Sequence, residues 1–357
     1  MTRFLRFRFL CWDLSTRRTT GAGARTTHLE MDDGLDRLIR DHRERGKESL
    51  FVGEERREYV HPVAPPGTFL QALERSFTGA KKAAEDAKRF WNQPIRDVLR
   101  RTTGLRLVVG DWNAQVPVRV VDNVMPEFLW VIGALNDEAG WDVIFAMDAL
   151  LDAAKGLKRL ASLARKHPGL GFTVGECEAE SERIHSLLRA SGASALLQRF
   201  RSVPRDILGC YWYDPLDPRI DLYWMAIATL AKVLNVSVES LTVVVLAHEL
   251  AHAYSQLGRD IDKWDWPVFF FHKTSKDVVE GIAQFYTELV VHDLAPRYPD
   301  ARRAYQRLLK LQSGPYLAHL DWKPNDTHRG EIIRSAMMEF RRSGELTHEE
   351  FLRRLDR

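Results

Sequence analysis

The chain has few cysteines, no long apolar run and little net charge for its length. Only three cysteines, Cys11, Cys177 and Cys210, occur in 357 residues. Widely spaced cysteines in odd number indicate free thiols in a reducing compartment and exclude a small scaffold held by disulfides. No stretch reaches the roughly 18 consecutive apolar residues that a membrane-spanning helix needs. We therefore expect a cytoplasmic protein without a membrane partner.

The positive charge is concentrated at the amino terminus. The formal net charge is +3, and residues 1–28, with six arginines and one aspartate, contribute +5 of it, which leaves −2 for the remainder. A near-neutral body lacks the basic surface that nucleic-acid-binding proteins present. We therefore expect no nucleic-acid partner.

Segments rich in proline and glycine, together with the spacing of apolar residues, divide the chain into three regions. The segment HPVAPPG, residues 61–67, breaks regular structure. We expect residues 1–67 to be a partly disordered extension, residues 68–205 to be mainly helical, and residues 206–357 to carry the chemistry. Apolar spacing predicts helices at 31–42, 68–91, 126–136, 141–166, 177–190 and 194–201, and two β-rich runs at 105–109 and 116–121 that could form a hairpin. The predicted class is α+β and predominantly helical.

One pentapeptide carries most of the functional information. The segment VVVLAHELAH, residues 243–252, contains His-Glu-x-x-His. Ser237 and Gly258 stand where the caps of a single helix are expected. Residues four apart on a helix lie side by side, so His248 and His252 can bind one metal ion. Glu249, about 100° further round the axis, is placed to reach a water molecule on that ion and act as a general base.

A third metal ligand is expected further along the chain. A catalytic zinc takes three protein ligands and keeps one position for water. Proteases with a third histidine six residues past the second need glycine at position 255 and histidine at position 258, and Ser255 and Gly258 exclude them. Glu280 lies near the start of a second predicted helix, residues 276–293. Gly281, the next residue, would let the two helices approach closely. Glu288, two turns further, is the reserve ligand.

The motif HELAH followed by the helix that contains EGIA resembles the gluzincins, zinc metallopeptidases whose third ligand is a glutamate on a second helix. The resemblance covers residues 206–293, and the whole chain is closest to an uncharacterised bacterial zincin-like group. It implies a zincin-like core with a short sheet or hairpin, Zn2+ held by His248, His252 and Glu280, and Glu249 as base and acid in the hydrolysis of a peptide or protein substrate.

The resemblance also implies roles outside the motif. A tyrosine or histidine downstream should stabilise the transition state, and of Tyr316, His319 and His328 we favour His319. Residues 219–224 should pair with residues 208–213 in a hairpin and serve as the edge strand that binds extended substrate. In one respect the chain departs from the pattern, because Gln284 stands where some gluzincins carry aspartate.

Other features stay open at the level of sequence. The aromatic residues of segment 259–272 could line an apolar subsite or pack beneath their loop. Arg334 could neutralise a buried acid, although an exposed arginine is the simpler expectation.

Two other functions remain possible. Peptide deformylases also use His-Glu-x-x-His, with a cysteine as third ligand, and Cys210 lies upstream of the motif. Alternatively, the fold is a non-catalytic binding or regulatory module stabilised by zinc. The presence of Glu249 argues against that alternative, because a purely structural zinc site has no use for a base.

Overall fold

The computed structural model describes residues 62–64, 74–75, 77–107, 115–132, 138–167, 173–190, 199, 207–213, 217–260, 264–322 and 329–355. All of them belong to the second of two units, Gly46–Arg357. The expected helices at 31–42 and 194–201 therefore lie wholly or almost wholly outside the described residues.

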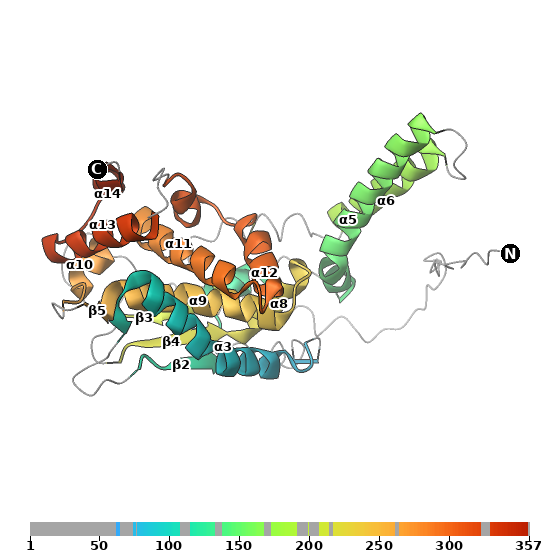
Figure 1. The fold of residues 1–357 in the computed structure, drawn as a ribbon. Coiled ribbons are helices and arrows are strands. Elements are labelled where there is room, and N and C mark those ends of the chain that lie inside the picture. The colour runs from blue at the N-terminus through green and yellow to red at the C-terminus, as the bar shows by residue number, and fades with distance from the viewer. Residues whose placement is uncertain are drawn as a thin grey trace. The chain divides into compact units, whose positions relative to one another are not determined.

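The described part of the chain is predominantly helical with two small sheets (Figure 1). In chain order its elements are α3 (Ala80–Thr103), β1 (Arg106–Leu107), β2 (Val118–Val121), α4 (Pro126–Ile132), α5 (Glu138–Lys166), α6 (Val174–Ala190), β3 (Gly209–Trp212), β4 (Arg219–Tyr223), α8 (Trp224–Val233), α9 (Val238–Leu257), β5 (Gly258–Arg259), α10 (Val268–Lys273), α11 (Lys276–Leu294), α12 (Pro299–Leu309), the 3-10 helix η1 (Gly314–Leu320), α13 (Arg329–Ser343) and α14 (His348–Leu355).

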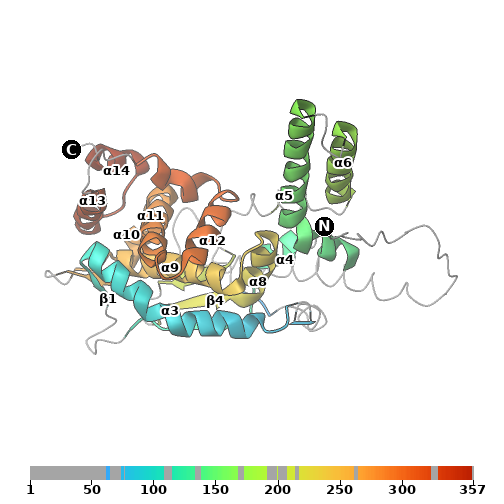
Figure 2. The same ribbon diagram turned by 45° about the vertical axis from the view of Figure 1, so that its right-hand side comes forward.

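Helix α9 is the centre of the core. It packs against α3, α11, α12 and strand β3, and every residue from Ser240 to Gln256 is buried. Both views show α9 between the three-stranded sheet and α11 (Figures 1 and 2). A helix that is apolar on all faces needs such enclosure. The predicted cap is confirmed, because the Ser237 hydroxyl accepts a hydrogen bond from the Ser240 amide at 3.0 Å.

The larger sheet has the strand order β2-β4-β3. Strands β3 and β4 pair antiparallel, which confirms the hairpin expected from residues 208–213 and 219–224. Strand β4 is the central strand, however, since β2 pairs with it in parallel on its other side. Its backbone groups are already bonded on both sides, so the assignment of residues 219–224 as a substrate-binding edge strand is wrong.

The hairpin expected between residues 105–109 and 116–121 is also wrong in the described residues. Strand β1 pairs antiparallel with β5, which follows α9, and β2 pairs with β4. An isolated two-stranded hairpin is marginally stable in water. In the structure β2 instead becomes part of a three-stranded sheet.

Helix α3 extends beyond the predicted end at residue 91. It runs from Ala80 through Pro94 to Thr103, where Gly104 adopts a left-handed conformation and its amide donates to the Arg100 carbonyl. The Tyr254 hydroxyl of α9 donates to the Arg96 carbonyl at 3.1 Å. The regions 68–205 and 206–357 therefore share one core as well as one sheet.

The remaining expected helices are present among the described residues. Helix α4 is described over Pro126–Ile132, and α5 and α6 include Glu138 and Val174, three residues before each predicted start. Helices α5 and α6 pack against each other, and the Ser181 hydroxyl donates to the Ala154 carbonyl at 3.2 Å. No described helix has both the length and the apolar character that crossing a bilayer requires.

Candidate metal centre

Three possible ligand atoms converge where α9 crosses the start of α11. The Nε2 atoms of His248 and His252 are 3.1 Å apart. Oε2 of Glu280 lies 3.3 Å from Nε2 of His248 and 3.2 Å from Nε2 of His252. The helical spacing places the two imidazoles on one face of α9, and the packing of α11 on α9 supplies the carboxylate.

These distances fit a metal ion. Zinc binds histidine nitrogen and carboxylate oxygen at about 2.0–2.2 Å in tetrahedral geometry, in which neighbouring ligand atoms are about 3.3–3.5 Å apart. The three observed separations lie at or just below that range. His248, His252 and Glu280 are also the group among the described residues that could hold a metal ion, with both histidines buried and the glutamate half-buried.

The electrostatics of the cluster keep Glu280 ionised. Burial acts to raise the pKa of Glu280, but charge attraction and hydrogen bonding from His252 and His248 outweigh that effect and hold the pKa well below its usual value. Glu280 is therefore ionised at neutral pH, which is the protonation state in which a carboxylate binds metal.

Glu249 lies beside the cluster against strand β3. Its side chain is buried, and a Cβ atom added to Gly209 would meet Oε1 and Cγ of Glu249 at 2.9 Å and Cγ1 of Val245 at 2.8 Å. A side chain at position 209 would therefore displace Val245 and Glu249. Sequence reasoning missed this role, although a glycine inside a strand is a signal of close approach.

Gly281 has a different role from the one expected. A Cβ atom there would meet the Trp322 ring at 2.5 Å and 2.6 Å, and the Ala318 methyl at 3.5 Å. The glycine therefore makes room for the indole that follows η1, and not for α9. The prediction of a close helix–helix approach at this glycine was wrong, because the long-range position of Trp322 is not encoded locally.

The residues of η1 divide between the metal centre and the core. The Tyr316 ring lies 6.1 Å from the His248 ring, measured between centroids. His319 is fully buried, its Nε2 lies 3.1 Å from the Tyr305 hydroxyl, and it lies 4.0 Å from Oε2 of Glu288. These contacts give no support to His319 as the residue that stabilises the transition state. Tyr316, whose ring is near His248, is the better candidate. His328 lies outside the described residues.

Other candidates are placed away from the three ligand atoms. Glu288 is two turns past Glu280, about 12 Å along α11. Cys210 follows Gly209 in β3, and since neighbouring strand residues point to opposite faces, it faces away from Glu249. Arg334 pairs with Asp260 at 2.7 Å and donates to the Thr103 carbonyl, so it does not neutralise an acid of the cluster.

The carboxyl end of α9 is anchored to strand β3 and to the segment that follows α9. The Tyr211 hydroxyl donates to Oε1 of Gln256 at 2.6 Å, and the Trp266 amide donates to the Gln256 carbonyl at 2.7 Å. The buried Arg341 guanidinium donates to the carbonyls of Gln256, Gly258 and Trp264. Desolvation lowers the pKa of Arg341 to about 10. These contacts fix the carboxyl end of α9.

The aromatic residues of segment 259–272 divide into a buried group and an exposed group. Trp266 and Phe271 are buried beneath the loop, whereas Trp264, Phe269 and Phe270 are exposed.

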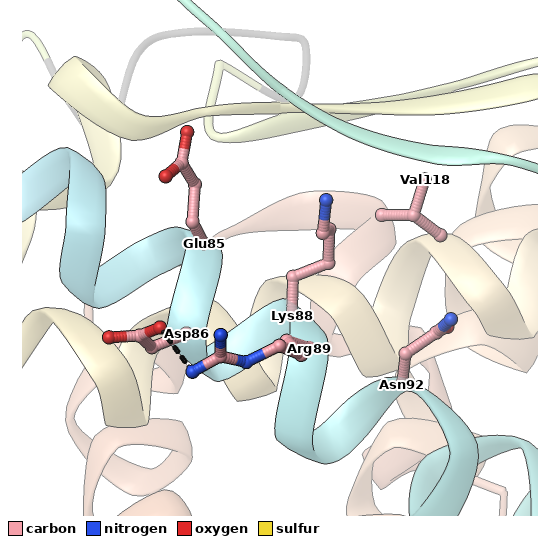
Figure 3. Close-up of a pocket in the computed structure, with 6 residues that line it drawn as sticks. All are labelled: Glu85, Asp86, Lys88, Arg89, Asn92 and Val118. Carbon is pink, nitrogen blue, oxygen red and sulfur yellow. Dashed lines mark hydrogen bonds and ion pairs between the residues drawn. The ribbon is translucent and has the colours of Figure 1, made fainter.

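A separate hollow lies between α3 and β2, with a volume of about 500 Å³ (Figure 3). Acidic and basic side chains line it together, and Asp86 pairs with Arg89 at 2.8 Å. It contains none of the three ligand residues, so the candidate functional site remains the cluster on α9 and α11.

Comparison of the chain with protein-family models, curated proteins and solved structures gave no significant match. The functional assignment therefore depends on the residues and geometry of the site.

Proposed function

We propose that the protein is a zinc-dependent peptidase with a zincin-like core. The observation that carries the proposal is the convergence of the His248, His252 and Glu280 ligand atoms within 3.1–3.3 Å of one another, with the buried Glu249 beside them. A His2Glu set is the donor chemistry of a catalytic zinc with an open fourth position. When bound, zinc supplies Lewis acidity that polarises a carbonyl and lowers the pKa of a water molecule.

The protein's own residues supply the proton transfers. Glu249 accepts a proton from the attacking water and then donates it to the nitrogen of the leaving amine, so that one carboxylate acts first as base and then as acid. The Tyr316 hydroxyl, carried by η1 next to His248, is the proposed donor to the oxygen that gains charge in the transition state.

Strand β3 is the proposed support for an extended substrate. Among the described strands it pairs only with β4, and it begins at Gly209 directly against Glu249. A peptide added along the other edge of β3 would gain main-chain hydrogen bonds and pass the base. This role replaces the one that the sequence assigned to residues 219–224.

The test is to compare Glu249→Gln with the wild-type protein and with Glu239→Gln, a control on the same helix. Wild type and control should cleave members of a broad peptide library. Glu249→Gln should lose about 10²–10⁴-fold in kcat, the usual contribution of a general base, while zinc content by atomic absorption stays stoichiometric in all three.

Two outcomes separate the other readings. If all three proteins bind zinc and none cleaves any peptide, the protein is a zinc-stabilised binding or regulatory module. If Cys210→Ser, and not Glu280→Ala, removes zinc, the deformylase-like reading is correct. The orientation of Cys210 away from Glu249 weighs against that outcome.

A further inference from the structure

Exposed aromatic side chains are concentrated in one short segment. Trp264, Phe269 and Phe270 are 58%, 60% and 37% exposed. We call these three residues the α10 aromatic surface. They are three of the five aromatic residues among the exposed large apolar side chains of the described chain. Contiguous exposed apolar residues mark interaction sites more often than scattered ones do.

The backbone beneath this surface is firmly held. The buried rings of Phe271 and Trp266 are in edge contact at 5.4 Å between centroids. Arg341 donates to the Trp264 carbonyl at 3.0 Å, and the Trp266 amide bonds to α9. Rigid, exposed aromatic side chains give large contact areas at a small cost in conformational entropy.

The surface follows directly from strand β3. Tyr213, the residue after β3, makes a 2.7 Å hydrogen bond between its hydroxyl and Nδ1 of His272 in α10, and its ring contacts Phe271 at 5.7 Å. Strand β3 therefore leads from Gly209, beside Glu249, to α10. Four residues of extended chain span about 13 Å.

We propose that the α10 aromatic surface is a substrate subsite that selects a large apolar side chain, aromatic above all, about four residues from the cleaved bond. This inference rests on the proposed function. Antiparallel pairing is the more stable arrangement per residue. It places that side chain on the amino-terminal side of the cleaved bond.

The charge next to the surface adds a second preference. The Lys273 ammonium lies 4.4 Å from the centroid of the Phe269 ring. A positive charge already on this ring disfavours lysine or arginine in the substrate at the same position.

The experiment uses zinc-loaded full-length protein and a set of peptides that differ only at the fourth residue before the cleaved bond, which is Phe, Leu, Ala or Lys. Wild type should cleave the Phe peptide with a kcat/KM at least tenfold above that of the Ala peptide, with Lys lowest. Phe269→Ala and Trp264→Ala should each reduce this preference at least threefold, through KM and with little change in kcat.

Phe90→Ala is the matched control. Phe90 lies on α3 and is 62% exposed. The Arg89 guanidinium lies 4.7 Å from the centroid of its ring, so Phe90, like Phe269, is an exposed ring next to a positive charge. This variant should keep the wild-type preference. A second readout is the fluorescence anisotropy of labelled peptides binding to Glu249→Gln, with and without Phe269→Ala, which reports recognition without turnover.

The outcomes distinguish the inference from the proposed function. Cleavage with no preference at the fourth residue, or a preference that Phe269→Ala and Trp264→Ala both leave intact, overturns the inference and leaves the peptidase standing. If no peptide is cleaved and none binds to Glu249→Gln, both proposals fail together.

Discussion

Replacing Glu280 with glutamine tests the metal centre most directly. The change keeps the size of the side chain and removes the charge that lies 3.2–3.3 Å from the two histidine nitrogens. Apparent binding free energies of structural zinc sites are about 10–16 kcal/mol for four ligands, or about 2.5–4 kcal/mol per ligand. At about 1.4 kcal/mol for each factor of ten, Glu280→Gln should weaken zinc binding by about 10²–10³-fold.

The affinity is measured by competition with a chromophoric chelator at pH 7, and thermal unfolding gives an independent reading. Zinc at about 1,000 times its Kd stabilises a native protein by about 4.1 kcal/mol. The wild-type Tm should therefore rise on zinc addition, and the Tm of Glu280→Gln should rise far less at the same concentration.

Glu288→Gln is the control, since Glu288 lies two turns along the same helix beside His319. It should bind zinc as the wild type does. Wild-type affinity in Glu280→Gln, or an equal loss in Glu288→Gln, would refute the assignment of Glu280 as the third ligand.

Three further predictions concern the packing around the site. Gly209→Ala should retain zinc but lose about 10²-fold in activity, because its Cβ displaces Glu249; Gly156→Ala, where a Cβ meets nothing within 4 Å, should leave activity unchanged. Arg341→Met leaves three carbonyls without their donor and should lower the free energy of unfolding by at least about 3 kcal/mol in urea titration; an unchanged midpoint would contradict this role. Burial acts to raise the pKa of Asp122, but hydrogen bonds from Lys81 and Trp224 outweigh it and lower the pKa, so its stabilisation is complete above about pH 4 and is lost as pH falls through the lowered pKa. The stability of Asp122→Asn should therefore fall less than that of wild type between pH 5 and pH 3.

The cluster of His248, His252 and Glu280 was predictable because its signals are local or nearly so. The caps and the spacing of His248 and His252 define α9 by short-range rules, and the structure confirms that helix. Glu280 lies near the start of a second helix whose amphipathic pattern is also local, and the structure confirms α11 at residues 276–294. Once two such helices pack, the ligand atoms have few alternative positions.

The features that sequence reasoning missed depend on which distant segments meet. Nothing near residues 118–121 indicates a parallel partner at β4, and that pairing makes β4 the central strand and removes it as an edge strand for substrate. The distinction between Tyr316 and His319 likewise depends on how η1 lies across α11 and α12, since the two residues are one 3-10 turn apart.

The rotation of α9 about its axis controls both halves of the proposed chemistry. His248 and Glu249 are consecutive, so their side chains leave the helix about 100° apart. One turns toward α11 and Glu280, and the other turns toward Gly209 of β3. The metal side and the substrate side of the site therefore cannot be adjusted independently. The Gln256 contacts to Tyr211 and Trp266, and those of Arg341 at the end of α9, hold that rotation against β3 and the segment that leads into α10. A change at the end of α9 should thus alter zinc affinity and substrate preference together, whereas a change in the α10 aromatic surface should alter substrate preference alone.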